Sequence, residues 1–592
     1  MVSASSETNV SSGNSPALST GGTPLGLTFD DRYLENFGLP FSFSFFGQLY
    51  NTVTISTNGN LYFSPPPKRS NGDADDVPGS TADLSLNKMI AGMWDDLDLR
   101  TSRRADADVY VLQPGAGRII FRWQGVQFGD GTTGDQINFE IELRSDGNII
   151  TRYGSGNTNL QPVVGISGGE ADPYVIDQLT SELSPKTLTN AQSATFVPRT
   201  VVQLTAAGYT VSEGAGHADI TLTRSGDLTS PSTVSFTTSD SAGSQTCGAV
   251  NGKASSRCDY VGTFGTAQFG VGEASKTVTI PVVDDAFAEG SETFGVAISN
   301  GLGTNIGAQI NATVTITDND SASGSNPLSD NSFFVRQQYL DFLSREPDSS
   351  GLAFWTNQTT NCGSSDLLVC RINVSGAFFL SIEFQETGYL VERIYKAAFG
   401  DASGTAGGQP IKVPFVRLNQ FLPDTQRIGR GVVVNVGNWR PQLDDNKNAF
   451  TEEFVQRPEF LTALPLSMTA TDFVNKLNDN AKDSNGVMPL SAAERDNLVA
   501  ALNNGTMTRA QVLRAVAEDP DLANSEKNRA FVLMQYFGYL RRNPNDAPES
   551  GLDYGGYNFW LGKLNGTNGD YIAAEMVKAF LSAPEYNQRF AQ

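Results

Sequence analysis

The chain has few of the residues on which many enzymes and metal sites depend. Its 592 residues include one histidine, His217, and four cysteines. One histidine cannot build a multi-histidine zinc site, and no Cys-x-x-C motif supplies a tight zinc or redox pair. An apolar run of about 18 residues is also absent, so the sequence predicts no membrane-spanning helix. We therefore expect a protein that is not an enzyme and does not insert into a membrane.

Basic residues are scarce as well. The chain has 41 Lys and Arg against 64 Asp and Glu, which gives a formal net charge of −23 and a pI near 4.5. Nucleic acids and anionic membranes are bound through basic patches, so neither is an expected partner. The 59 glycines suit β-rich modules with many turns, and the length suits roughly three or four domains.

The four cysteines form two local pairs, Cys247 with Cys258 and Cys362 with Cys370. Each pair lies in a Gly/Ser/Asn-rich segment, where a small loop could be closed. Two disulfides, and hence an extracellular or cell-surface location, are the expectation; four reduced thiols are the alternative. No signal peptide is visible, because residues 2–24 lack a basic start and an apolar core. We expect residues 1–24 to be a flexible polar leader.

Acidic clusters follow alternating, β-branched runs in residues 200–320. Thr277–Ile280 precedes Asp284, and Ala312–Ile316 precedes Asp318, which places these acids at strand ends. Strand ends of a β-sandwich gather at its two poles, so acids that are distant in sequence can meet there. Crowded carboxylates repel one another unless a cation neutralises them. Calcium, which takes roughly 6–8 oxygen ligands, fits best.

These acidic motifs resemble the Calx-beta domain, a calcium-binding sandwich repeated in sodium–calcium exchangers and in many bacterial surface proteins. The resemblance implies calcium ligands at one pole: the carboxylates of Glu213, Asp240, Asp284, Asp285, Glu289, Glu292, Asp318 and Asp320, and the carbonyl of Phe287. Asn319 stands where the best calcium binders carry a further acid, and it can still offer an amide oxygen. Asp259 is assigned a turn or capping role. The alternative is that the acids only cap turns and keep the surface soluble.

Residues 25–199 show a second β pattern. Phe41–Phe45 and Thr52–Ser56 alternate with period two, and Asn58-Gly59 is typical of a hairpin turn. Four segments resemble the NIDO-like (nidogen extracellular type) domain: Phe45–Gly47, Ser56–Gly59, Met89–Asp98 and Asp146–Ile150. This resemblance implies an extracellular adhesion or matrix module.

A polar linker over residues 321–332 leads to a region with helical periodicity, residues 333–592. The pattern Tyr-x-x-x-Leu-x-Arg-x-Pro occurs at Tyr339–Pro347 and again at Tyr536–Pro544, and Gly-x-x-x-Trp follows at Gly351–Trp355 and Gly556–Trp560. Such repeats imply stacked helical units, and we expect their Trp and Phe to be core residues. The unit resembles a bacterial helical domain of unknown function that is related in pattern to phycobilisome-linker domains.

The sequence thus predicts a multidomain protein: two all-β sandwich-type domains followed by an all-α helical repeat domain. The expected function is that of an extracellular, calcium-binding adhesion or surface scaffold protein. Its partner would be a cell-surface or matrix protein or a glycan. One alternative is a self-assembling subunit of a surface layer or filament, which predicts homo-oligomers. Another is a carbohydrate-active hydrolase, which predicts a deep N-terminal cleft lined by two carboxyl groups.

Overall fold

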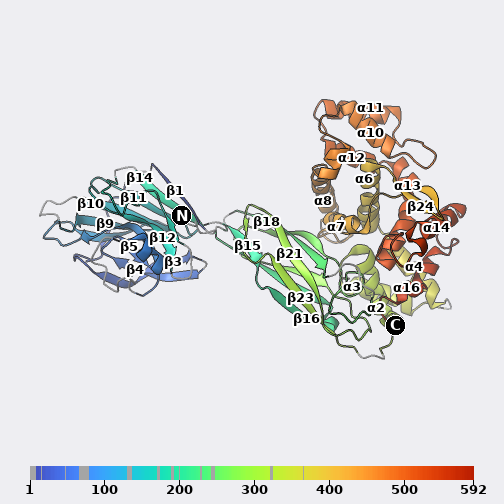
Figure 1. Ribbon diagram of the computed structural model, residues 1–592, viewed down its shortest axis with the longest axis horizontal. Coiled ribbons are helices and arrows are strands. Elements are labelled where there is room, and N and C mark those ends of the chain that lie inside the picture. The colour runs from blue at the N-terminus through green and yellow to red at the C-terminus, as the bar shows by residue number, and fades with distance from the viewer. Residues whose placement is uncertain are drawn as a thin grey trace.

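The computed structural model describes residues 8–14, 17–46, 48–65, 79–129, 136–169, 174–188, 192–198, 200–226, 228, 230–241, 247–320, 324–363 and 366–591. Three bodies follow one another along the chain, two built of β-strands and one of helices (Figure 1). The predicted fold class, β-domains followed by a helical region, is confirmed.

The first body consists of two sheets with a shared hydrophobic core. Trp123 lies in this core, stacked on Phe139 with ring centroids 5.0 Å apart, and its indole N–H donates to the carbonyl of Ser56 at 2.8 Å. The first sheet has the order β1 (Thr8–Asn14), β14 (Gln192–Pro198), β11 (Ile149–Tyr153), β10 (Gln136–Arg144), β9 (Arg118–Gln127), β8 (Asp108–Gly115) and β2 (Thr23–Pro24), with β7 (Leu97–Asp98) paired to β9. The second has the order β13 (Tyr174–Ile176), β12 (Val163–Gly168), β6 (Lys88–Trp94), β5 (Asn60–Tyr62), β4 (Gln48–Ser56) and β3 (Tyr33–Phe45), and the short helix α1 (Thr81–Leu86) precedes β6.

Part of the expected flexible leader belongs to this body. β1 pairs antiparallel with β14, so that Thr8 lies opposite Pro198, and β2 pairs with β8. The prediction of a flexible leader over residues 1–24 is therefore wrong for these two strands. A polar segment has no hydrophobic pattern that would predict a strand, but the open edge of a sheet can order it through backbone hydrogen bonds. Residues 1–7, 15 and 16 lie outside the described residues.

The second body is a two-sheet sandwich. One sheet has the order β20 (Ser275–Pro281), β17 (His217–Ser225), β15 (Val201–Leu204) and β22 (Asn305–Ile306). The other has the order β16 (Gly208–Ser212), β23 (Asn311–Thr317), β21 (Glu292–Leu302), β18 (Ser232–Asp240) and β19 (Phe264–Phe269). Tyr260 stacks on Phe294 in the core, with ring centroids 3.9 Å apart. The disulfide between Cys247 and Cys258 is formed as predicted, and so is the one between Cys362 and Cys370 in the helical body.

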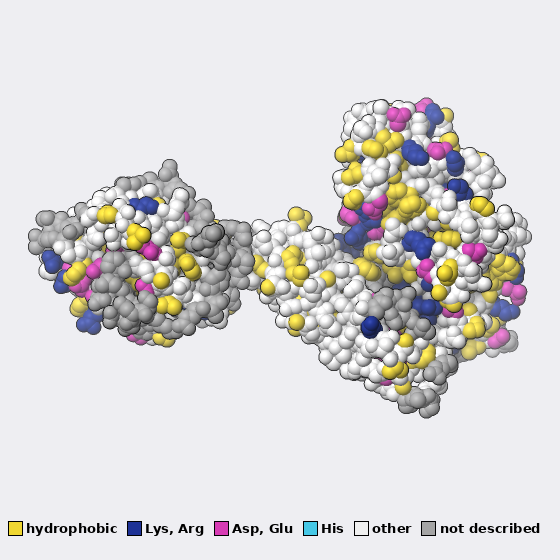
Figure 2. Space-filling model, in the orientation of Figure 1, with side chains coloured by type: hydrophobic (Ala, Val, Ile, Leu, Met, Phe, Trp, Pro, Cys, Tyr) yellow, Lys and Arg dark blue, Asp and Glu magenta, His cyan; other side chains and the backbone are white. Residues whose placement is uncertain are grey.

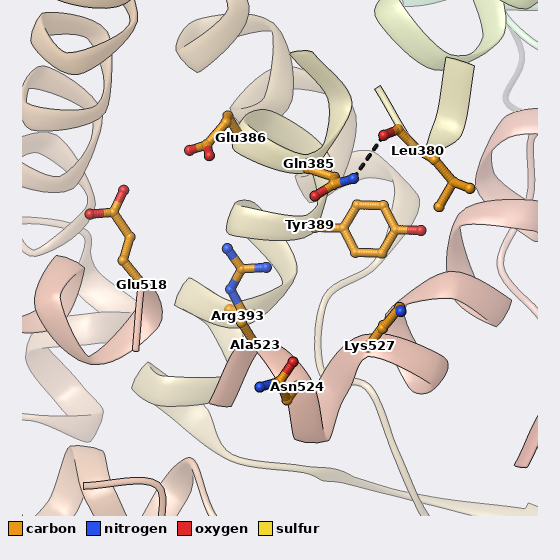
Figure 3. A pocket seen from close by; sticks show the side chains of 9 residues that line it. All are labelled: Leu380, Gln385, Glu386, Tyr389, Arg393, Glu518, Ala523, Asn524 and Lys527. Carbon is orange, nitrogen blue, oxygen red and sulfur yellow. Dashed lines mark hydrogen bonds between the residues drawn. The ribbon is translucent and has the colours of Figure 1, made fainter. Parts of the chain in front are cut away.

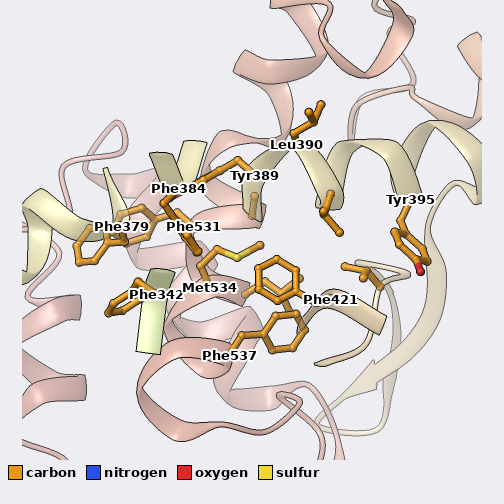
Figure 4. Packing of buried hydrophobic residues seen from close by; sticks show 14 of the residues in the cluster. Phe342, Phe379, Phe384, Tyr389, Leu390, Tyr395, Phe421, Phe531, Met534 and Phe537 are labelled. Carbon is orange, nitrogen blue, oxygen red and sulfur yellow. The ribbon is translucent and has the colours of Figure 1, made fainter. Parts of the chain in front are cut away.

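The third body is helical and contains one small hairpin, β24 (Ala402–Ala406) with β25 (Gln409–Val413). Its α-helices are α2 (Asn331–Gln338), α3 (Ser349–Thr360), α4 (Leu367–Phe379), α5 (Ile382–Phe384), α6 (Leu390–Phe399), α7 (Leu418–Gly429), α8 (Trp439–Phe454), α9 (Pro458–Ala463), α10 (Ala470–Asn480), α11 (Ala492–Asn503), α12 (Arg509–Ala517), α13 (Pro520–Gln535), α14 (Gly555–Gly566), α15 (Met576–Leu581) and α16 (Pro584–Asn587). Three π-helical turns join them: η3 (Tyr339–Leu343), η4 (Gln385–Tyr389) and η5 (Tyr536–Leu540). The described residues also form three 3-10 turns: η1 (Glu213–Ala215) in the sandwich, η2 (Pro327–Ser329) before α2, and η6 (Ser550–Leu552). Aromatic side chains from helices far apart in sequence fill the core, among them Phe342, Phe379, Phe531 and Phe537 (Figure 4).

The two aligned Tyr-x-x-x-Leu-x-Arg-x-Pro segments make corresponding contacts. In the first, the guanidinium of Arg345 lies over the ring of Tyr339 and donates from Nε to Glu383 at 2.7 Å. In the second, Arg542 lies over Tyr536 and donates from Nε to Glu585 at 2.7 Å. The shared sequence pattern therefore encodes a shared ion pair that ties each π-helical turn to a later helix.

The aromatic residues after the two repeated glycines only partly match the expectation of a core position. Trp355 and Trp560 are half-buried, whereas Phe354 and Phe559 are exposed to 55% and 56%. The prediction is wrong for the two phenylalanines, since neighbouring helix positions face different directions and only one of each pair can face the core.

Within the described residues, no single helix is long and apolar enough to cross a membrane. A bent pair, α4 with the helical segment Ile382–Phe399, meets the length and composition criteria. Most of its apolar residues belong to the helical core. Charged side chains gather over the helical body on the face shown in Figure 2, while the visible sandwich face carries few.

Candidate metal centre

The predicted acidic residues lie at the ends of sandwich strands. Glu213 follows β16, Asp285 follows β20 after a short loop, Glu292 begins β21, and Asp318 follows β23. The β-branched runs form these strands because alternating side chains bury one face, and the acids begin where that alternation stops.

Three carboxylates form a first group. One oxygen from each of Glu213, Asp318 and Asp320 lies within 4.8 Å of the others. The Oδ2 of Asp318 is oriented by backbone amides, since it accepts from Glu289 and Gly290, both at 2.8 Å. The Oδ2 of Asp320 is buried and has no hydrogen-bond partner among the described residues. A buried carboxylate oxygen without a partner is costly, and a cation would remove that cost.

Asp259, Glu289 and Glu292 form a second group on the same 4.8 Å criterion. The capping role expected for Asp259 is present, because its Oδ2 accepts from the backbone amide of Ser255 at 2.6 Å. The same carboxylate also faces the two glutamates, and this role was missed by the sequence interpretation. The available signal was that Asp259 belongs to one of the acidic motifs of this region, Cys258-Asp259-Tyr260.

Asp285 lies near both groups. Its backbone amide donates to Glu213 at 2.9 Å, and its Oδ1 accepts from the amide of Phe287 at 2.8 Å. Its Oδ2 is buried and lacks a hydrogen-bond partner within the described part of the chain. Glu213, from the first group, and Glu289, from the second, both act on it electrostatically. The charges of a member of each group therefore act on the Asp285 carboxylate, although Asp285 itself belongs to neither three-carboxylate group.

Two further predicted ligands already have protein partners. Asp240 accepts from the hydroxyl of Tyr260 at 2.5 Å and from the amide of Ser256 at 2.8 Å. Asp284 accepts from the side-chain nitrogen of Asn319 at 3.1 Å. Among the described residues, neither aspartate belongs to a three-carboxylate group. Their carboxylates are thus available to a cation only if these hydrogen bonds are shared or exchanged.

Burial and mutual repulsion raise the pKa values of Glu213, Asp259, Asp285, Glu289 and Glu292. Burial is the largest cause in each case. The pKa of Asp285 rises to about 10 and that of Glu213 to about 8, with repulsion from neighbouring carboxylates adding to burial. The pKa values of Glu289 and Glu292 rise to about 7, and that of Asp259 lies well above its usual range. Without a cation, several of these groups hold protons near neutral pH.

The donor set fits calcium. All side chains of both groups offer carboxylate oxygens, and two buried oxygens, from Asp285 and Asp320, have no hydrogen-bond partner among the described residues. Hard oxygen donors without nitrogen or sulfur suit Ca²⁺ rather than zinc or copper.

The chain segment that carries Asp285 also contacts the helical body. Val283 is part of the hydrophobic core formed with the helices, and the backbone amide of Ala286 donates to the carbonyl of Phe590 at 2.9 Å. Residues on both sides of Asp285 therefore contact the helical body, while the charges of Glu213 and Glu289 act on its carboxylate.

Three arginines extend this interface. Arg336, on α2, donates to the carbonyls of Gly216 and Val282 at 2.9 and 3.0 Å. Arg257, beside the acidic pole, pairs with Glu585 at 2.8 Å, and Arg589 donates to the Arg257 carbonyl at 2.9 Å. The acidic pole and the docking surface of the sandwich are thus one continuous region.

Comparison with protein families gives three matches in the order predicted. Residues 7–212 match the NIDO-related family, residues 198–320 match the Calx-beta domain, and residues 318–387 match a domain of unknown function, DUF4214. The chain has the modular architecture that these matches describe.

The chain is also similar to a sodium/calcium exchanger. The chain is 27% identical over 206 residues to the sodium/calcium exchanger Calx of Drosophila melanogaster, a match that covers 33% of this chain and 20% of the exchanger. Among solved structures, the apo-form Calx CBD1 domain is 28% identical and is covered to 99%, against 21% of this chain, with a TM-score of 0.18. The CBD12 unit from CALX1.2 is 29% identical, with coverages of 46% and 21% and a TM-score of 0.18. The chain thus spans one fifth of the exchanger's length.

Proposed function

We propose that this protein is an extracellular, calcium-binding modular adhesion or scaffold protein, in which calcium fixes the sandwich against the helical body. The observation that carries the proposal is the position of Asp285. Its buried Oδ2 has no hydrogen-bond partner among the described residues, Glu213 and Glu289 act on its charge, and Val283 and Ala286 beside it contact the helical body.

Each carboxylate group would hold one ion. Glu213, Asp318 and Asp320 would bind the first, and Asp259, Glu289 and Glu292 the second, with Asp285 available to either. When bound, calcium supplies the positive charge that these buried acids lack. The acids then remain ionised, and the loops that carry them no longer repel one another.

The interface explains how such binding would have a mechanical effect. Loops whose carboxylates repel one another sample many conformations. Ordering such loops when the sandwich docks on the helical body costs conformational entropy. Calcium would order the segment around Asp285 before it meets the helices. The angle between sandwich and helical body would then be fixed, which suits a protein that presents its outer modules to a partner.

The extracellular setting is supported by the two disulfides and by the module types. The net charge of −23 favours a cell-surface or matrix protein or a glycan as partner over nucleic acid. A self-assembling subunit remains the second candidate, and it differs by forming homo-oligomers. Size-exclusion chromatography with light scattering, with and without calcium, separates the two roles.

Calorimetric titration of the full chain with calcium tests the proposal. Asp285→Asn keeps the shape of the side chain but removes its charge, and we expect it to weaken calcium binding by about tenfold or more, since ligand charge tunes affinity. Glu273→Gln is the matched control, because Glu273 lies before the start of β20 and Asp285 lies beyond its end. Equal calcium affinity in the wild type and in Asp285→Asn would refute the assignment of this pole.

A further inference from the structure

The helical body contains a cavity of about 510 Å³, which Figure 3 shows from close by. Its described lining includes two carboxylates, from Glu386 and Glu518, and two cations, from Arg393 and Lys527. These charges balance, so the cavity favours neither an anionic nor a cationic ligand. The disulfide of the sandwich is a more specific feature, because residues next to both of its cysteines act on one of the two carboxylate groups.

This disulfide, between Cys247 and Cys258, closes a loop over residues 247–258, which we call the disulfide loop. The two Cα atoms lie 5.7 Å apart. Asp259 directly follows the second cysteine, and one oxygen of its carboxylate lies within 4.8 Å of an oxygen from each glutamate of the second group. One end of the disulfide loop therefore leads directly into a candidate calcium ligand.

The other end of the disulfide loop also reaches the second group. Burial and the charge of Asp259 raise the pKa of Glu289, and a hydrogen bond from the backbone of Gly248, next to Cys247, opposes that rise. Gly248 also packs against Phe287, since a Cβ added to it would lie 2.7 Å from carbons of the phenyl ring. The residues that follow the two cysteines thus both act on Glu289.

The middle of the disulfide loop is attached beside Glu292, the third member of the group. The amide of Ala254 donates to the carbonyl of Thr293 at 2.9 Å, and the amide of Thr293 donates to the carbonyl of Gly252 at 3.1 Å. Thr293 directly follows Glu292 in β21. The disulfide loop therefore contacts or adjoins every ligand of the second group.

The first group is oriented by other parts of the chain. The amide of Asp285 donates to Glu213 at 2.9 Å, and the amides of Glu289 and Gly290 donate to Asp318, both at 2.8 Å. None of these three donors belongs to the disulfide loop. A change in that loop should therefore act on the second group more strongly than on the first.

A covalent link at this place has a clear physical effect. Three carboxylates repel one another when no ion is bound, and the repulsion favours separation of the segments that carry them. The disulfide limits that separation, because it holds the segments of Gly248 and Asp259 close together. Groups that orient metal ligands in this way typically contribute roughly 10- to 100-fold to metal affinity.

We propose that the Cys247–Cys258 disulfide is the positioning element of the second calcium site. Neither cysteine contacts the ion, and the disulfide acts through Asp259 and Glu289. The inference rests on the proposed function, because it presupposes that the second group binds calcium. It adds that the ion of the second group depends on a bond that forms in oxidising compartments, whereas the ion of the first group does not.

Calorimetric titration of the full chain with calcium tests the proposal. The cysteine variant carries Cys247→Ala and Cys258→Ala, and the matched control carries Cys362→Ala and Cys370→Ala, which remove the disulfide of the helical body. We expect two ions in the wild type. The cysteine variant should bind the ion of the second group roughly 10- to 100-fold more weakly. Its affinity for the other ion, and both affinities of the control, should change by less than about threefold.

Two further substitutions identify which ion is affected. Asp320→Asn weakens the ion of the first group, and Glu292→Gln weakens the ion of the second. When the cysteine substitutions are added to Asp320→Asn, they should weaken the ion that remains tightly bound. When they are added to Glu292→Gln, the affinity of the remaining ion should change by less than about threefold.

Gly248→Ala tests the same assignment with the disulfide intact. An added Cβ would overlap the Phe287 ring, at a backbone φ of +78°, and would displace the loop from Glu289. Gly272→Ala is the control, because Gly272 has a φ of +76° and open space for a Cβ among the described residues. We expect Gly248→Ala, but not Gly272→Ala, to weaken the ion of the second group by about tenfold or more.

Selective weakening of the ion of the second group in the cysteine variant and in Gly248→Ala supports the proposal. Two ions bound with wild-type affinities in the cysteine variant overturn it, while calcium binding itself stands. If the cysteine variant loses both ions, as an unfolded sandwich would, Gly248→Ala decides, and equal weakening of both ions there overturns the proposal. A wild-type chain that binds one ion or none contradicts the assignment of an ion to each group under the proposed function, and this inference with it.

Discussion

The backbone amide of Ala286 in the sandwich donates to the carbonyl of Phe590, near the end of the helical body, at 2.9 Å. The carboxylate of Asp285, the adjacent residue, is acted on by the charges of Glu213 and Glu289 and has one oxygen without a hydrogen-bond partner among the described residues. One peptide unit thus separates a candidate calcium ligand from the contact between two bodies. Any ion that orders Asp285 also orders that contact.

Hydrogen exchange should reveal this coupling. Calcium at about 100 times its dissociation constant stabilises the bound state by about 2.7 kcal/mol, or up to about 100-fold in the opening equilibrium. We expect calcium to slow amide exchange both in residues 282–290 and in residues 585–591. The amides of α13 around Phe531, deep in the helical core, serve as the control and should not change. Protection confined to residues 282–290 would argue against coupling.

Asp259 and Asp240 should differ in their importance for calcium. Asp259→Asn keeps the acceptor for the Ser255 amide but removes one charge from the second group, so we expect about tenfold weaker binding. Asp240→Asn alters a side chain that already accepts hydrogen bonds from Tyr260 and Ser256. We expect this variant to change calcium affinity by less than about threefold. Calorimetry on both variants measures the difference. The reverse order would mean that Asp240 exchanges its partners for the ion.

The first β-body should lose stability in acid through Glu142. Burial alone would raise the pKa of Glu142, but hydrogen bonds from Arg118, Arg152 and Arg144 lower it from 4.5 to about 2. The folded state therefore binds fewer protons than the unfolded state between these values. The resulting stability, about 3 kcal/mol, is fully present above pH 4.5 and is lost as the pH falls toward 2.

Denaturant unfolding between pH 2 and 7 checks this expectation in the wild type and in Glu142→Gln. The variant should be less stable at pH 7, because Arg118 and Arg144 lose their carboxylate partner and the nearly buried Arg152 keeps only Glu140 among the described carboxylates. It should also show a flatter loss of stability below pH 4.5. If Glu142→Gln lost stability with falling pH as steeply as the wild type does, groups other than Glu142 would cause the acid sensitivity.

The glycine in the Gly-x-x-x-Trp pattern should be intolerant of a side chain. A Cβ on Gly351 would overlap the hydroxyl of Tyr339, and a Cβ on Gly556 would lie 2.5 Å from the hydroxyl of Tyr536. We expect Gly351→Ala to cost about 1–3 kcal/mol of unfolding free energy, as overpacking does. Gly562→Ala, in the open part of α14, is the control and should be neutral or stabilising by up to about 1 kcal/mol. Urea unfolding compares them, and equal stabilities would remove the steric explanation.

Much of the architecture could be predicted from local patterns. Period-two runs such as Thr277–Ile280 became strands, the four cysteines paired with their near neighbours, and the region after residue 330 became helical. These features depend on neighbouring residues, so a linear sequence contains them. The strand β1 could not be predicted in this way, because a polar segment joins a sheet only if an edge is open to receive it.

The sequence by itself determined that acids would gather at strand ends, since alternation fixes where each strand stops. Only the tertiary structure decided which acids face one another. In it Asp259 lies close to Glu289 and Glu292, and Asp240 accepts a hydrogen bond from the hydroxyl of Tyr260. The hydrogen bond from the Ala286 amide to the Phe590 carbonyl likewise exists only in the folded structure. Side-chain direction and long-range contact follow from how whole bodies pack, because the same local pattern is compatible with many such arrangements.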